Sequence, residues 1–218
     1  MTDSRNEKVR IERTKGGLLT DSFRWILDNY EFQRWHEGNW SRLLWIKDDA
    51  GKGKTMLMID VINELQQQVV RSGKSSVTIL LLVSRHRLTA TAILRGMIYL
   101  LASEKPSLIS NLRKKYDHAG RKLFDDSSAF YDVLRQMVQD PKLTTVYLVV
   151  DALDECEVGL SQLLDLITWT VSAQRTCVKW IVSSRNRYDI EQCLGLDIRL
   201  NLELNADHIS HAVDVYVD

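Results

Sequence analysis

The sequence has few of the residues that interrupt or cross-link a chain. Its 218 residues include two prolines and three cysteines. The cysteines, Cys156, Cys177 and Cys193, form neither a C-x-x-C pair nor a metal-ligand spacing. These features argue against a disulfide framework or a zinc site as the basis of the fold, and they favour reduced thiols in an intracellular protein.

Net charge and long apolar runs are also absent. Lys plus Arg and Asp plus Glu number 29 each, a balance that gives no support to a nucleic-acid surface or a polybasic membrane patch. The longest apolar runs, VTILLLV and MIYLLA, are too short to span a bilayer. The polar N-terminal segment has no apolar signal core. We therefore expect a cytoplasmic globular protein whose partners include neither nucleic acid nor membrane.

The apolar residues that are present fall into two patterns. Five short runs bounded by polar residues are typical of buried parallel strands, at 42–46, 77–83, 146–151, 178–183 and 198–204. The last run alternates apolar and polar residues, as an edge strand does. Helical stretches lie between the runs, at 54–70, 89–103, 106–116, 127–139, 160–173 and 188–194. This alternation predicts an α/β domain with a mainly parallel sheet flanked by helices.

Two further helices are expected at the ends. Before the first strand, Leu18, Leu19, Phe23, Ile26 and Leu27 recur at helical spacing, with a break at HEGNWS. The segment 206–217 follows the last strand and has the pattern of one more helix. We therefore expect an N-terminal helical extension over residues 1–40 and a core domain over residues 41–218.

The segment DDAGKGKT, residues 48–55, matches the phosphate-loop pattern G-x-x-x-x-G-K-[ST] at every fixed position but the first. Gly51 and Gly53 allow a tight turn whose N–H groups cradle phosphate at a helix start. Lys54 can reach the β- and γ-phosphates, and the Thr55 hydroxyl can bind Mg²⁺. The expected nucleotide-binding residues are Asp49, Ala50, Gly51, Lys52, Gly53, Lys54, Thr55 and Met56. The alternative is a solvated turn that merely opens a helix.

Asp48 replaces the first glycine of this pattern. A carboxylate about 5 Å from a phosphate, at an effective dielectric of about 20, weakens binding by at most about 3 kcal/mol, roughly a hundredfold. A Cβ at this position is also expected to strain the turn. Asp48 can therefore weaken a nucleotide site without abolishing it.

Polar residues follow two of the predicted strands. Asp151 ends YLVVD, where a carboxylate can hold Mg²⁺, and Asp154 and Glu155 can orient or deprotonate an attacking water. Arg185 ends VKWIVSSR and could contact a γ-phosphate. We expect Asp154, Glu155 and Arg185 to be catalytic, and Thr55 and Asp151 to bind Mg²⁺. The alternatives are an acidic helix cap and a surface arginine.

Together, GKGKTML, VYLVVDALDEC and VKWIVSSRN resemble the NACHT domain of the STAND P-loop NTPases. The longer segments RIERTKGGLLTDSFRWILDN and AILRGMIYLLASEKPSLISNLRKKYDHAG resemble the NACHT region of fungal heterokaryon-incompatibility proteins and fungal NOD-like receptors. This segment is also described as a nephrocystin-type N-terminal P-loop domain. The resemblance implies a three-layer fold with a five-stranded parallel sheet in order 5-1-4-3-2. It implies ATP or GTP with Mg²⁺ as cofactors, and it assigns Arg185 as the sensor of the γ-phosphate.

The sequence also differs from the family pattern in several places. Besides Asp48, the second strand region reads LLLVSRHR, which leaves the roles of Arg85 and Arg87 open. Family members carry an effector domain, a winged-helix region and C-terminal repeats, so we expect a fragment, a truncated product or a stand-alone module. The implied function is a slowly hydrolysing nucleotide switch that controls homo-oligomerisation, or assembly with other NACHT-domain proteins, in incompatibility or innate-immune signalling. The alternative is a NACHT scaffold deficient in nucleotide binding; a small-molecule P-loop kinase fits the acidic strand end less well.

Overall fold

The computed structural model of the chain describes ten segments of its 218 residues. They are residues 25–38, 42–72, 76–81, 88–120, 127–141, 143, 145–173, 176, 178–195 and 198–201. The expected C-terminal helix, the helix start near Thr20 and Asp21, and Arg85 and Arg87 lie outside the described residues. Of the helices that the structure describes, none combines the length and hydropathy needed to cross a membrane.

The five predicted strands form one parallel sheet. Its strands are β1 (Leu43–Lys47), β2 (Ser76–Leu81), β4 (Thr145–Val150), β6 (Val178–Ser184) and β7 (Ile198–Asn201). They lie in the order β2-β4-β6-β1-β7, and every pairing is parallel. Counted along the chain as strands 1 to 5, this is the order 5-1-4-3-2 that the family resemblance implies. β7 lies at the edge of the sheet, as its alternating pattern predicts.

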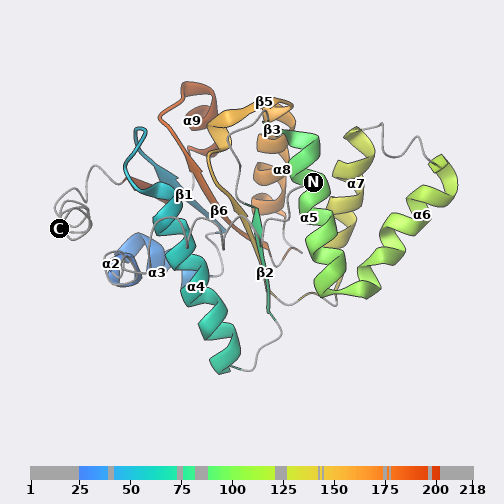
Figure 1. Cartoon of the computed structure of the whole chain (residues 1–218), viewed down its shortest axis with the longest axis horizontal. Helices are drawn as coiled ribbons and strands as arrows, with labels where there is room; N and C mark the ends of the chain where they lie inside the picture. Colours follow the sequence, from blue (N-terminus) through green and yellow to red (C-terminus); the bar gives the residue numbers. More distant parts are fainter. Residues whose placement is uncertain are drawn as a thin grey trace.

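Helices cover both faces of this sheet (Figure 1). α2 (Trp25–Asp28), α3 (Tyr30–Glu37) and α4 (Lys54–Ser72) lie on one side, and α5 (Ala90–Glu104), α7 (Ser127–Val138) and α8 (Leu160–Ser172) on the other. α6 (Ile109–Ala119) follows a short 3-10 turn (Pro106–Leu108) and packs on α7 away from the sheet, while α9 (Tyr188–Leu194) follows β6. The helices predicted between the strands are therefore present, with ends within a few residues of the prediction.

Two apolar cores follow from the alternation of side chains along the strands. In β6, Val178, Trp180 and Val182 face α5, α7 and α8, whereas Ile181 faces α3 and α4. β1 divides in the same way, with Trp45 in the first core and Ile46 in the second. Because both faces are covered, the strands are continuous apolar runs rather than alternating ones.

The N-terminal helix is broken where the sequence pattern predicts one helix. Asn29 ends α2 in an extended conformation, and its side chain accepts hydrogen bonds from the N–H groups of Glu31 (2.9 Å) and Phe32 (3.3 Å). Asparagine competes with the helix by bonding to nearby backbone groups, which makes it a strong N-cap. A second unpredicted feature is the short parallel pair of β3 (Leu88–Thr89) and β5 (Cys156–Val158).

Lys179, on β6, links the sheet to the end of α3 through hydrogen bonds. Its ammonium donates hydrogen bonds to the carbonyl oxygens of Trp35 (2.8 Å), His36 (2.6 Å) and Gly38 (3.0 Å), at the end of the helix. These are helix-terminal carbonyls, which favour a cation. Burial, with a smaller contribution from the Arg42 guanidinium, lowers the pKa of Lys179 from 10.5 to about 8.

Replacement of Lys179 by methionine tests this contact. We expect Lys179→Met to lower the free energy of unfolding by about 1–3 kcal/mol at pH 7, because three carbonyls lose their donor. Between pH 8 and 10.5 the unfolded parent binds more protons at this lysine than the folded parent, so its stability rises with pH relative to the variant. Urea titrations of both proteins from pH 7 to 10 measure this difference. A constant difference over that range would contradict the lowered pKa.

Candidate functional site

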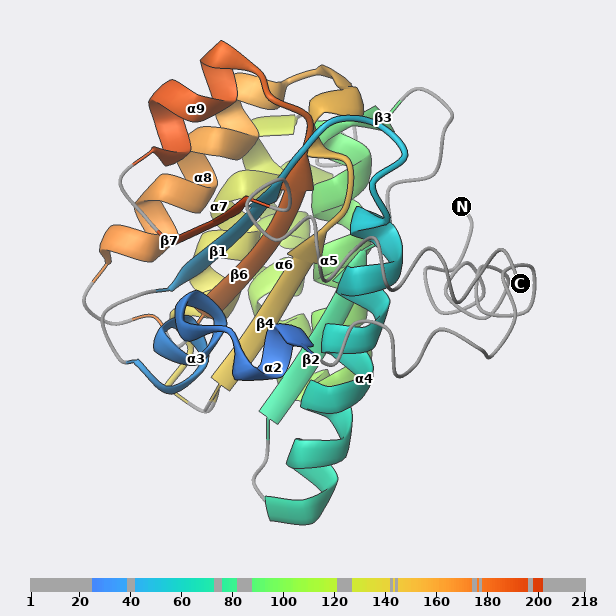
Figure 2. The same ribbon diagram turned by 90° about the vertical axis from the view of Figure 1, so that its left-hand side faces the viewer.

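Three loops meet at one edge of the sheet, at the carboxyl ends of β1, β6 and β4 (Figure 2). β6 lies between the other two strands, with Lys47 opposite Ser184 and Val150 opposite Val182. The chain leaves β1 into α4 on one face and leaves β6 toward α9, whose buried residues belong to the core on the other face. Ligands of open α/β sheets bind at such a point, where successive connections leave on opposite faces.

The loop from β1 to α4 has the backbone that a phosphate-binding loop needs. Gly51 and Gly53 adopt positive φ angles of 81° and 77°, a region that favours glycine. A Cβ added to Gly51 would meet nothing within 4 Å, so this part of the loop borders open space. α4 begins at Lys54, directly after the turn, so its first N–H groups face the loop.

The predicted binding residues divide into a surface loop and a buried helix start. Asp49, Ala50, Gly51 and Lys52 are exposed, and Gly53, Lys54 and Thr55 are half-buried. Met56 is buried in the core beneath α4, so only its backbone can face a ligand. The Lys54 ammonium lies over the loop and donates hydrogen bonds to the carbonyl oxygens of Asp48 (2.7 Å) and Asp49.

Asp48 is buried at the start of this loop, with 1% of its surface exposed. Its N–H donates to the Ser184 carbonyl (3.3 Å), which extends the contact between β1 and β6, and its Oδ1 accepts from the Asp49 N–H (2.6 Å). The expectation that a Cβ here strains the turn is wrong, because Ala152 is the one non-glycine residue with positive φ in the described part of the chain. Asp48 therefore differs from a glycine at this position in two ways. It adds a negative charge, and its side chain accepts the hydrogen bond of the Asp49 N–H.

The surroundings of Lys54 shift the pKa of its ammonium in opposite directions. Burial lowers the pKa of its ammonium. The carboxylates of Asp48, Asp154 and Asp151, in that order, oppose this shift, and the Arg185 guanidinium adds to it. Lys54 is thus a partly desolvated cation with three carboxylates nearby, and Asp48 is the largest single contributor of compensating charge.

Thr55 and Asp151, 96 residues apart in the sequence, are in contact. Thr55 Oγ1 donates a hydrogen bond to Asp151 Oδ2 (2.6 Å), and the second oxygen of Asp151 accepts from the Ser183 hydroxyl. A hydroxyl and a carboxylate side by side are the ligands that a protein offers to Mg²⁺ shared with phosphates. Within the described ranges, no group of three or more His, Cys, Asp or Glu side chains could hold a metal by itself. The donor set of Thr55 and Asp151 fits a magnesium ion.

The predicted catalytic residues lie together beside this pair. Arg185 donates its N–H to Asp154 Oδ1 (2.9 Å) and forms ion pairs with Asp154 (3.3 Å) and Glu155 (3.5 Å). Sequence reasoning missed Arg187, which donates to the Asp154 carbonyl (2.9 Å) and pairs with Asp189. It also gave no role to Ser183, because Ser183 and Ser184 end an apolar strand together and nothing in the sequence distinguishes them.

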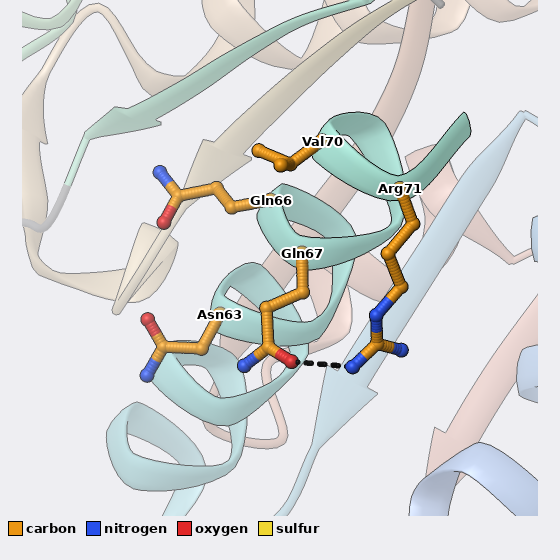
Figure 3. Close-up of a pocket in the computed structure, with 5 residues that line it drawn as sticks. All are labelled: Asn63, Gln66, Gln67, Val70 and Arg71. Atoms are coloured by element: carbon orange, nitrogen blue, oxygen red, sulfur yellow. Dashed lines mark hydrogen bonds between the residues drawn. The ribbon is translucent and has the colours of Figure 1, made fainter. Parts of the chain in front are cut away.

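A separate hollow of about 410 Å³ lies along the outer face of α4 (Figure 3). The described residues that line it all come from this helix, and they are Asn63, Gln66, Gln67, Val70 and Arg71. Arg71 is held there by Gln67 (3.0 Å) and Glu64 (3.8 Å). The described lining offers carboxamides, a valine and one engaged guanidinium but no carboxylate, imidazole or thiol, so it provides less chemistry than the sheet-edge site.

Residues 21–185 match the family model described as Nephrocystin 3, N-terminal. The chain belongs to this family. It is also 48% identical over 223 residues to the vegetative incompatibility protein HET-E-1 of Podospora anserina, aligning over 100% of the chain and 16% of that protein. The resemblance to a NACHT-type P-loop domain is thereby confirmed. The chain spans a small part of the length of this curated relative.

A solved structure supports the same fold for this nephrocystin 3 N-terminal domain. The Aeropyrum pernix ORC1 protein, solved in complex with DNA, superposes with a TM-score of 0.52 at 15% sequence identity. The alignment covers 88% of this chain and 48% of that chain. At this identity the likeness shows the P-loop NTPase fold alone.

The position of the Asp48 carboxylate predicts a measurable change at Lys54. In Asp48→Asn the pKa of Lys54 should fall further below its usual value, because the largest charge that raises it is removed. The pKa can be followed by NMR of the labelled lysine side chain. Asp49→Asn is the matched control, because that exposed carboxylate is not among the charges that shift Lys54. An unchanged Lys54 pKa in Asp48→Asn would contradict the buried position of the carboxylate.

Proposed function

We propose that this domain binds ATP or GTP together with Mg²⁺ and acts as a slowly hydrolysing NACHT switch. The observation that carries the proposal is the meeting of three elements at one sheet edge. The glycine loop with Lys54 follows β1, the Thr55–Asp151 pair links α4 to the end of β4, and Arg185 follows β6 beside Asp154 and Glu155. Phosphoryl-transfer sites depend on this combination of backbone cradle, metal ligands and cation.

Each residue has a role that follows from its position. Residues 49–56 supply backbone N–H groups to the phosphates, and Lys54 supplies the ammonium, now held by two loop carbonyls that it can exchange for phosphate oxygens. Thr55 and Asp151 would hold Mg²⁺, and a bound ion would neutralise charge on the phosphates.

The two acidic residues after Asp151 take different roles in this proposal. Asp154 is nearly buried, with a side chain 7% exposed, and it accepts from both the N–H and the guanidinium of Arg185. Glu155 is more exposed, at 33%, and makes one longer contact with Arg185 (3.5 Å). Glu155 is therefore the better placed to orient or deprotonate a water, while Asp154 holds the loop that carries Arg185.

The biological setting comes from the curated relative. HET-E-1 is named as a vegetative incompatibility protein, and this domain aligns to one segment of it. We propose that the nucleotide state of the domain controls its self-association, or its assembly with other NACHT domains, in incompatibility or innate-immune signalling.

A second candidate function is a scaffold that does not bind nucleotide, and Asp48 is the observation that favours it. Its buried carboxylate already occupies the Asp49 N–H and lies near the Lys54 ammonium. It therefore takes up a donor and a charge that a phosphate would use. A scaffold of this kind would show no thermal stabilisation by Mg²⁺-nucleotide, because only a ligand that binds the folded state stabilises it.

Removal of the Lys54 ammonium tests the site assignment. We expect Lys54→Ala to weaken Mg²⁺-nucleotide binding by about a hundredfold or more, since one charge close to a phosphate is worth about 3 kcal/mol. Isothermal calorimetry with ATP and GTP measures the effect. Lys115→Ala is the control, because it removes an equal charge that pairs with Asp132 on α7. Equal affinity in the parent and Lys54→Ala would overturn the assignment.

Substitution of Asp48 decides between the switch and the scaffold. If the domain is a switch, the parent binds nucleotide, and Asp48→Asn and Asp48→Gly bind up to roughly a hundredfold more tightly. Asn keeps the size of the side chain and removes its charge, so equal gains in both variants assign the effect to charge. If the parent fails to bind while both variants bind, the chain is a silenced scaffold. Failure of all three proteins to bind would contradict the nucleotide site itself.

A further inference from the structure

Ser183 is a fully buried serine at the carboxyl end of β6, with 0% of its surface exposed. Its hydroxyl donates a hydrogen bond to Asp151 Oδ1. The Ser183 hydroxyl oxygen in turn accepts a hydrogen bond from the Ala152 N–H (2.9 Å). The hydroxyl thus uses its donor on the carboxylate and an acceptor site on the backbone directly after it.

The fold explains why these groups meet. Val150 lies opposite Val182 in the parallel pairing of β4 and β6, so Asp151 and Ser183 are the next residues along the two strands. Ser183 follows Lys179 and Ile181 at two-residue spacing and therefore points to the α4 side, where Thr55 lies. Ala152 turns the chain with a φ of 51°, and its N–H points back to the Ser183 hydroxyl.

Each oxygen of the Asp151 carboxylate therefore has a hydrogen-bond partner of its own. Oδ1 is held by Ser183, and Oδ2 is held by Thr55 at 2.6 Å. Rotation of the carboxylate would break both bonds in a buried place, where Asp151 is only 4% exposed. Ser183 therefore fixes the plane of the carboxylate, and with it the direction in which the other oxygen faces Thr55.

We propose that Ser183 is a positioning residue for magnesium, holding the Asp151 carboxylate so that Oδ2 and the Thr55 hydroxyl are presented together. This inference rests on the proposed function, because it needs Mg²⁺ to bind at that pair. Groups that orient a metal ligand typically change metal affinity by about 10–100-fold when removed. The hydrogen bonds of Ser183 run to Asp151 and Ala152 and not to the loop or to Lys54, so we expect nucleotide binding without metal not to depend on it.

The neighbouring Ser184 provides a matched control. It is also 0% exposed, and it lies on the opposite face of β6. Its hydroxyl accepts from Trp45 Nε1 (2.9 Å) and donates to the Arg185 carbonyl (2.9 Å). Ser184→Ala thus removes an equally buried hydroxyl with two hydrogen bonds, one residue along, without touching Asp151.

The experiment measures nucleotide affinity with and without magnesium. Non-hydrolysable ATP and GTP analogues are first compared on the parent chain, and the tighter one is titrated in Mg²⁺ and in EDTA. We expect Ser183→Ala to weaken binding 10–100-fold in Mg²⁺ and by less than about twofold in EDTA. Ser183→Thr keeps the hydroxyl and should therefore keep the parent's ratio of affinity in Mg²⁺ to affinity in EDTA. Ser184→Ala should also leave this ratio at the parent value. Ser183→Cys, a close match in size with a weak donor, replaces the alanine variant if that protein fails to fold.

The outcomes separate this inference from the proposed function. If the parent chain binds neither analogue, the proposed function is overturned, and so is the role of Ser183 that rests on it. A parent whose binding depends on magnesium, with an unchanged ratio in Ser183→Ala, overturns the positioning role alone. Equal losses in Ser183→Ala and Ser184→Ala also overturn it, because they would reflect general loosening of β6.

Discussion

The parallel pairing of β4, β6 and β1 is the constraint on which the rest of the structure depends. Because the strands are parallel and buried on both faces, their carboxyl ends emerge at one edge. Three polar contacts of the site join the ends of different strands or the loops that follow them: Thr55 to Asp151, Ser183 to Asp151 and Arg185 to Asp154. The sheet therefore sets the geometry, and the connecting loops need only supply suitable side chains.

Much of this arrangement could be predicted from the sequence, because its causes are local. A run such as VYLVV is apolar at every position only when a strand is covered on both faces, and a glycine pair before Lys54 permits the positive φ angles found at Gly51 and Gly53. The carboxylate of Asp151 could be placed at the site edge because parallel strands end together. The order of the strands came from the family resemblance, since periodicity carries no information on which strands are neighbours.

The features that could not be predicted depend on contacts between distant residues. Lys179 is one polar residue in an apolar strand, and nothing in its surroundings along the chain indicates that it bonds to carbonyls 141 to 144 residues away. Ser183 and Ser184 are identical in the sequence, yet they face opposite sides of β6 and contact Asp151 and Trp45 respectively. The break at Asn29 is different, since its cap is local and a side-chain N-cap within a helical pattern could have signalled it.

Charge, rather than the shape of the loop, separates this site from one that begins with glycine. The positive φ angles of the loop belong to Gly51 and Gly53, whereas Asp48 continues the backbone contact of β1 with β6 and has no such angle. Its carboxylate accepts the Asp49 N–H and compensates the charge of Lys54. An anionic ligand must therefore compete with an internal anion for the same N–H and the same ammonium. For the proposed nucleotide site, we therefore expect the strength of that competition, rather than a defect in the backbone of the loop, to set the affinity for phosphate.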